Sequence, residues 1–278
     1  MKRNHLPIIL GMALIALLMG SCDALFTNQF QTLGLGQVSS EDLQKADAES
    51  LIAQSGINDG RISQSFIDAA LADDDTKAIV LSELNTAAGD SDPEIAQTAQ
   101  VLIIEIELQD SGADEIVGNV GSMIDVITND DNFDPSTPED LNALIDALIP
   151  DGVSGDELAN MFDALTNLGV PGGEIDTLGG NLVANSGLQN DNIDAGTLAQ
   201  TAVMASVLAT LDPVAPGTTT GEALVAALAD PDNFNTYINI PDSDGDGLSD
   251  LEELGDNANL AAILQAGGLT FLLDAING

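Results

Sequence analysis

Residues 137–169 read TPEDLNALIDALIPDGVSGDELANMFDALTNLG and set the fold class that we predict for the chain. Thr137 is a good helix N-cap, and Pro138 suits the first helical position. Apolar side chains then recur every three or four residues, which places them on one face of a helix. These side chains are Leu141, Leu144, Ile145, Leu148 and Ile149. Pro150 ends this predicted helix, because proline lacks the N–H that would continue it.

A second helix is predicted later in the same stretch. Ser154 and Glu157 have the spacing of a capping box, in which each side chain bonds the backbone N–H of the other residue. Gly169 is predicted to end the helix in the left-handed conformation. The inward face consists of Leu158, Met161, Phe162 and Leu165. Because the linker between the two helices is short, we expect an antiparallel helical hairpin.

The same helix signals occur before and after this hairpin. Asp92-Pro93 opens a helix that is followed by another with the same apolar spacing. The predicted inward residues are Ile95, Ala99, Leu102, Ile103 and Ile106, and then Ile116, Val120, Met123, Ile124 and Ile127. Residues 197–211 are apolar or small on nearly every side, which predicts a central buried helix. Only residues 235–240 read as a short extended segment. We therefore predict an all-α fold, either a multi-helix bundle or an irregular stack of helical hairpins.

Composition limits the partners of this chain. Hydrophobic residues make up 44% of the 278 residues, which is enough for a folded core. Acidic residues number 46 against 5 basic ones, and no basic residue follows Lys77. Such a surface is unsuited to nucleic acid, because binding needs cations that displace the phosphate counterions. Its self-repulsion needs screening, either by a high-salt habitat or by bound cations, and the sequence leaves both explanations open.

The N-terminus has the pattern of a secretory signal. Basic residues near Met1 precede an apolar run over residues 6–19, and Gly20-Ser21 then leads to Cys22. The string LMGSC at residues 18–22 resembles the lipobox of bacterial lipoproteins. This resemblance implies that Cys22 is lipidated and becomes the new N-terminus, so the protein is anchored outside the cytoplasm to a bacterial membrane. The alternative is an ordinary signal peptide with an incidental cysteine.

The lipoprotein hypothesis limits the chemistry of the mature chain. His5 and Cys22 are the only residues of their types, so the mature chain has no histidine and its cysteine is acylated. Catalysis by a Cys/His pair and zinc or iron sites with these ligands are excluded. We expect a signal peptide at 1–21, a lipidated tether at 22–38 and a helical domain at 39–240. A calcium loop and a C-terminal helix packed on the body follow at 241–278.

Residues 242–253 read DSDGDGLSDLEE and match a calcium-binding loop. Calcium takes six to eight oxygen ligands, which such a loop supplies from positions 1, 3, 5, 7, 9 and 12. Gly247 occupies position 6, where the chain turns sharply. The predicted ligands are Asp242, Asp244, Asp246, the Leu248 carbonyl, Asp250 and Glu253. The loop resembles an EF-hand and, more closely, the calcium repeats of thrombospondin type 3. The alternative is a solvated Asp-rich turn.

The surroundings of this loop differ from those of a full EF-hand. Pro241 and an extended segment precede it, so no entering helix is predicted, and the chain has no second copy that would form a pair. We expect a short exit helix at 249–254 and a final apolar helix at 260–276, interrupted by Gly267-Gly268. The predicted role of calcium is structural: it fixes the angle at which the last helix docks.

Three functions are compatible with these patterns. The first is a lipid-anchored cell-envelope protein with a structural calcium site, serving as a non-enzymatic binding or scaffold component with a protein partner in the envelope. The second is a carrier of a small apolar ligand held between helices. The third is a carboxylate-based hydrolase, for which the aromatic platforms that bind sugars are scarce.

Overall fold

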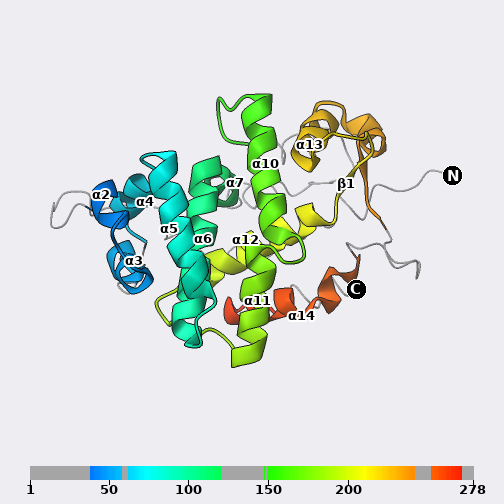
Figure 1. The fold of residues 1–278 in the computed structure, drawn as a ribbon. Coiled ribbons are helices and arrows are strands. Elements are labelled where there is room, and N and C mark those ends of the chain that lie inside the picture. Colours follow the sequence, from blue (N-terminus) through cyan, green and yellow to red (C-terminus); the bar gives the residue numbers. More distant parts are fainter. Residues whose placement is uncertain (1–37, 58–61, 120–146, 148, 242–251, 271–278) are drawn as a thin grey trace.

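The computed structural model describes residues 38–57, 62–119, 147, 149–241 and 252–270 (Figure 1). Within these residues the chain is mostly helical, and its strands form one short antiparallel ribbon. The predicted all-α class is therefore confirmed. The predicted helix at 138–149 lies outside the described residues apart from Ala147 and Ile149, and both of these pack against the core.

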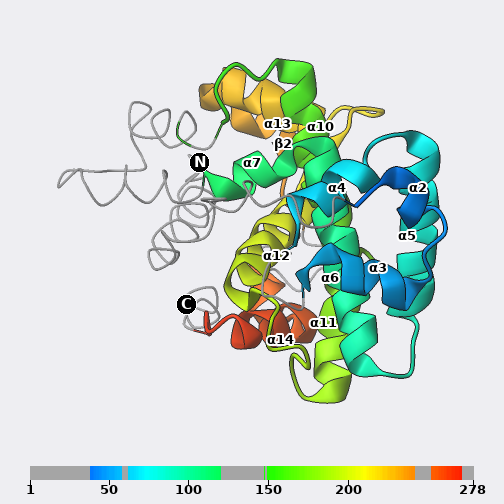
Figure 2. The same ribbon diagram turned by 90° about the vertical axis from the view of Figure 1, so that its left-hand side faces the viewer.

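The first part of the chain forms α2 (Ser40–Leu43), α3 (Ala48–Ser55), α4 (Gln64–Ala70), α5 (Asp74–Ala88), α6 (Pro93–Ser111) and α7 (Ala113–Gly118). The second part forms α10 (Gly155–Gly169), α11 (Glu174–Asn185), α12 (Ala195–Ala209), α13 (Thr220–Ala229) and α14 (Ala258–Ala266). Two 3-10 helices are η2 (Pro231–Thr236) and η3 (Glu252–Asp256). Strand β1 (Asp212–Pro213) pairs with β2 (Ile238–Asn239), and Pro213 lies opposite Ile238. Helices α2 to α5 lie on one side of α6, and α12 and α14 lie on the other (Figures 1 and 2).

Helix α6 is a central element of the body. Asp92 caps it by accepting a 3.0 Å hydrogen bond from the Glu94 N–H, and Pro93 occupies its first turn. Of the five side chains predicted to face inward, four are buried and Ile95 is half-buried. Three polar side chains are buried as well, and one of them, Gln97, accepts a 2.8 Å bond from the Gln189 backbone. The helix is covered on most sides because α5, α10 and α11 all pack on it.

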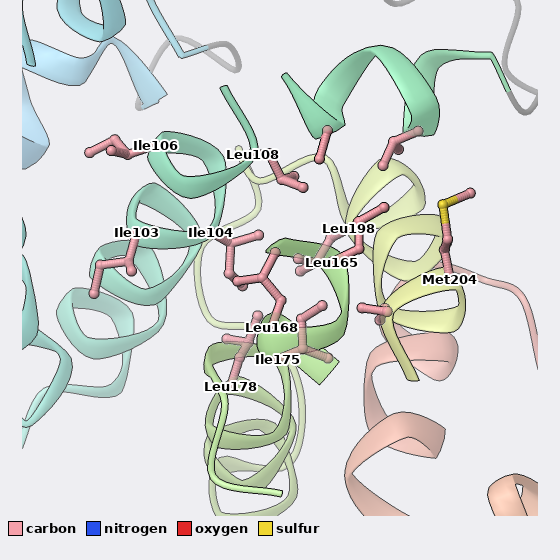
Figure 3. Close-up of a cluster of buried hydrophobic side chains, with 14 of the residues drawn as sticks. Ile103, Ile104, Ile106, Leu108, Leu165, Leu168, Ile175, Leu178, Leu198 and Met204 are labelled. Carbon is pink, nitrogen blue, oxygen red and sulfur yellow. The ribbon is translucent and has the colours of Figure 1, made fainter. Parts of the chain in front are cut away.

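Helix α12 is the second central element, as residues 197–211 predicted. Its residues 201–206 are all buried, and it packs between α10 and α14. Side chains from α6, α10, α11 and α12 meet in one hydrophobic cluster, in which Ile104, Leu165 and Leu198 are labelled (Figure 3). Leucine, isoleucine and alanine dominate this core, as expected of a chain with so few aromatic residues.

Helix α10 begins as predicted but ends differently. Ser154 accepts a 3.3 Å bond from the Glu157 N–H, and Glu157 accepts a 2.9 Å bond from the Ser154 N–H, which completes the capping box. The predicted inward face is buried. The prediction for Gly169 was wrong, because this residue stays helical and the extended residue Val170 follows it. A Cβ on Gly169 would collide with the Ala205 backbone, so the glycine lets α10 and α12 approach each other.

Acidic side chains are placed where helices begin. Asp47, Asp73 and Asp194 each accept a backbone N–H at the start of α3, α5 and α12. Hydrogen bonds from the backbone N–H and the hydroxyl of Thr76 lower the pKa of Asp73. Negative charge is favourable at these positions because helix N-termini carry partial positive charge. Part of the acidic composition therefore serves helix capping.

Candidate calcium loop and its attachment to the helical body

Most of the predicted site lies outside the described residues. This holds for Cys22 and for five predicted calcium ligands, namely Asp242, Asp244, Asp246, Leu248 and Asp250. Glu253, predicted to supply the last ligand, is described and lies half-buried in η3. The structure also describes the segments on either side of the loop, and these define how it is attached to the body.

The chain enters the loop through β2. Residues 235–240 were predicted to be extended, and the structure bears this out for Ile238–Asn239, whereas η2 extends to Thr236. Ile238 is only 1% exposed, and the Tyr237 carbonyl accepts a 2.8 Å bond from the Val214 N–H. The ribbon of β1 and β2 packs on α13. The start of the loop is therefore fixed to the body by backbone pairing and by a buried side chain.

The chain leaves the loop through η3. An exit helix was predicted at 249–254, and its described part is a 3-10 helix that continues to Asp256. Leu254 is buried, and Asn257 then caps α14 by accepting bonds of 2.9 Å and 3.1 Å from the Asn259 and Leu260 N–H groups. Few residues thus separate Glu253 from Leu260, the first buried residue of α14.

Helix α14 is packed closely against the body. Its Leu260, Ile263 and Leu264 are buried, and it lies against α11 and α12. Two glycines allow this approach, because a Cβ on Gly179 would collide with Asn259 and a Cβ on Gly267 would collide with Ala195. Helix α14 ends at Ala266 and Gly268 has a φ of +72°, at the place where the interruption was predicted, and residues 271–276 of the predicted helix lie outside the described residues.

A polar contact fixes the position of α14 along α11. The Asn259 side chain donates a 2.7 Å hydrogen bond through Nδ2 to Asp176 Oδ1. The other oxygen of Asp176 accepts a 2.9 Å bond from the Gly172 N–H, which orients the carboxylate. This directional bond defines the register that apolar packing alone leaves free.

The loop is attached to the helical body at both of its ends. One end of the loop is attached to α13 through β2, and the other to α11 and α12 through α14. A cation held by the loop would offset the repulsion among its carboxylates. The arrangement suits a structural brace, because both attached segments pack on one body.

Sequence reasoning missed a group of half-buried carboxyls around the end of α6. Burial raises the pKa of Glu105, Glu107, Asp114 and Glu174. For two of them the sequence held a signal: Glu105 and Glu107 alternate with the core residues Ile106 and Leu108. Nearby, Lys77 donates a 2.9 Å bond to Asp110, and this contact raises the pKa of the lysine.

In the described part of the chain, no three or more His, Cys, Asp or Glu side chains are grouped as ligands of a metal ion. The described helices also include none that is both long enough and apolar enough to cross a membrane. Comparisons of the chain with protein-family models, with curated proteins and with solved structures find no match.

Proposed function

We propose that this protein is a lipid-anchored component of the bacterial cell envelope, in which calcium bound at residues 242–253 braces the C-terminal helix. Its task is non-enzymatic binding or scaffolding. The observation that carries the proposal is the close packing of α14 on α11 and α12 directly after the loop, over Gly179 and Gly267. A brace is useful at this position because the packing tolerates little displacement.

Electrostatics explains why the brace needs an ion. Four aspartates and Glu253 lie within twelve residues, in a chain whose net charge is −41. Without a cation their repulsion strains the link between β2 and α14. An ion that binds the folded chain and not the unfolded one stabilises the fold by mass action. Extracytoplasmic calcium modules typically bind in the range of about 0.1–1 mM, so ambient calcium would fill the site.

The test of the calcium site is thermal unfolding of the full-length protein in detergent. At constant ionic strength, about 1 mM calcium should raise the melting temperature relative to chelator, and magnesium should raise it less. Asp244→Asn and Glu253→Gln should abolish the calcium response. Glu252→Gln is the matched control, because it removes a neighbouring charge at a position that supplies no ligand. The same melting temperature with calcium and with chelator would contradict the proposal.

The test of the anchor is the chemistry of the mature N-terminus. Mass spectrometry of membrane-extracted protein should find an acylated Cys22 as its first residue. Cys22→Ser should move the protein from the membrane fraction to the soluble extracytoplasmic fraction. A mature N-terminus with a free cysteine thiol would contradict the lipid anchor and favour an ordinary signal peptide.

The scaffold role is tested by capture of envelope proteins on cross-linking in cells. Glu253→Gln should lose the partners that depend on the braced α14, whereas Glu252→Gln should retain them. An identical set of partners for both variants and the wild type would show that partner binding does not depend on the calcium site.

A further inference from the structure

The end of α6 forms an elbow with α7. Gly112 joins the two helices with a φ of +73°, a conformation that other residues adopt only with strain. A Cβ at this position would lie 2.9 Å from the Met161 Cε on α10. The hydroxyl of Ser111 accepts a 3.3 Å bond from the Ala113 N–H across the elbow. Gly112 therefore permits both the turn between α6 and α7 and the close approach of Met161.

One amide group connects two carboxyls across this elbow. Gln109 Nε2 donates to Glu105 Oε1 at 3.3 Å and to Asp114 Oδ2 at 2.9 Å. Glu105 belongs to α6 and Asp114 to the first turn of α7, and both are half-buried. A neutral amide with two hydrogens therefore stands between two acidic groups that lie on opposite sides of the elbow.

The surrounding charges do not neutralise this pair. No salt bridge among the described residues involves either carboxyl, and Lys77 on α5 is bound to Asp110 and Asp74. Further acids are close, since Glu115 acts on Asp114, and Glu107 on α6 faces Glu174 on α11. The charged residues of α10 are Asp156, Glu157 and Asp163; Glu157 caps the start of its own helix and Asp163 accepts the Gly221 N–H. Helix α12 has no titratable side chain.

We propose that the Gly112 elbow is a pH-sensitive hinge, in which a proton held by the Glu105–Asp114 pair keeps α7 closed on the body. In the closed form burial is the main reason why the pKa of both carboxyls is raised. The Gln109 hydrogen bonds offset part of this rise, and the charges of Asp114 on Glu105 and of Glu115 on Asp114 add to it. If α7 moves away, both groups are hydrated and their pKa values return to about 4. Low pH therefore favours the closed elbow. Opening increases as the pH rises from about 4 through the raised pKa of the closed pair, and it levels off above that value.

The closed elbow also buries apolar surface, so opening is a local equilibrium with a measurable cost. Ala113, Ile116 and Val117 of α7 are buried, and α7 packs on α10 and α12. The opening constant should rise roughly tenfold for each pKa unit that the pair loses on opening. This hinge is independent of the calcium loop, because the two features lie on different elements.

Hydrogen–deuterium exchange of the full-length protein tests the hinge. The reporter is the Asn119 N–H, which bonds the Glu115 carbonyl at 3.0 Å at the end of α7. After correction for the intrinsic rate, its protection in the wild type should fall roughly tenfold or more between about pH 4 and about pH 8. Glu105→Gln should weaken the pH dependence of this protection, because it removes one of the two carboxyls that titrate and retains an acceptor for Gln109, while Asp114 still titrates. Glu83→Gln on α5 removes a charge elsewhere and should keep the wild-type profile.

Three results would overturn the proposal. One is protection of α7 that does not change with pH, and another is a change matched by amides in the middle of α10, which would indicate global unfolding. The third is a Glu105→Gln variant that keeps the wild-type pH slope. A measurement on the wild type alone completes the test: carbon NMR should find that Glu105 or Asp114 titrates above the bulk of the exposed carboxyls, and ordinary titration of both would refute the hinge.

Discussion

Asn259 on α14 donates a 2.7 Å hydrogen bond to Asp176 on α11, and the backbone of the same asparagine lies against Gly179, one turn further along α11. The hydrogen bond sets the position of α14 along α11, and the glycine sets the distance between the two helices. A contact with both properties has little tolerance for rotation or displacement. The chain that leaves the calcium loop therefore enters a helix whose position is already strictly defined.

Gly179→Ala should lower the free energy of unfolding by about 1–3 kcal/mol, because a Cβ at this position collides with the Asn259 backbone. Gly180→Ala is the matched control. The nearest atoms to its Cβ belong to the Asn259 side chain at 3.8 Å and 3.9 Å, so the helix should gain stability by about 0.5–1 kcal/mol. Urea unfolding of both variants measures the difference. Equal effects of the two substitutions would show that α14 does not approach α11 this closely.

The hydrogen bond itself should contribute about 0.5–1.5 kcal/mol. A double-mutant cycle with Asn259→Ala and Asp176→Ala isolates this contribution from the other losses of each single variant. Because Asp176 also accepts the Gly172 N–H, Asp176→Ala should cost more than Asn259→Ala. A coupling energy near zero would mean that packing alone positions α14.

Gly169→Ala should be among the most destabilising single substitutions in the body, with a loss of about 3 kcal/mol or more. Its Cβ would overlap the Ala205 backbone, which cannot move without displacing the buried helix α12. Gly155→Ala at the other end of α10 is the control, since its Cβ meets Val225 Cγ1 at an ordinary 3.5 Å. Chemical unfolding of the pair provides the measurement, and a mild effect at Gly169 would refute the close approach of α10 and α12.

The same glycine shows the limit of sequence reasoning for the fold. Caps such as Asp92-Pro93 and the Ser154–Glu157 box act through neighbouring residues, so the sequence alone predicted where α6 and α10 begin. Gly169 was assigned to a left-handed cap because that is the usual reason for a glycine at a helix end. Its actual partner, Ala205, is remote in sequence, and only the packing of helices reveals it.

The ribbon and the loop illustrate two other limits. Strand β1 was not predicted, because two residues that include Pro213 carry no alternation of apolar and polar side chains. Its partner β2 lies on the far side of α13 in the sequence, and both strands pack on that helix. The predicted calcium ligands depend on spacing within twelve residues, which is legible in the sequence. The attachment of α14 depends on Gly179 and Asn259, which no local pattern connects.

Stability should depend on pH through Glu107. Burial is the main reason why its pKa is raised, and the charges of Glu174 and Asp110 add to it. At a pH below the ordinary glutamate pKa of about 4, Glu107 is protonated in both the folded and the unfolded chain, so its pKa shift does not change the free energy of unfolding. As the pH rises from there to the raised pKa, the folded state holds the proton more tightly, so stability falls, and the loss is complete above that pKa.

Glu107→Gln should therefore stabilise the protein at about pH 8, and the gain should shrink toward zero at about pH 4. Removing any acidic charge reduces the self-repulsion of a chain whose net charge is −41. The change in stability caused by Glu83→Gln on α5 must therefore be subtracted as a control. High salt should reduce the part of the gain that comes from Glu174 and Asp110, because salt screens charge repulsion. The part that comes from burial should persist. Urea midpoints of the three proteins across this pH range provide the measurement, and a constant gain for Glu107→Gln at every pH would contradict the raised pKa.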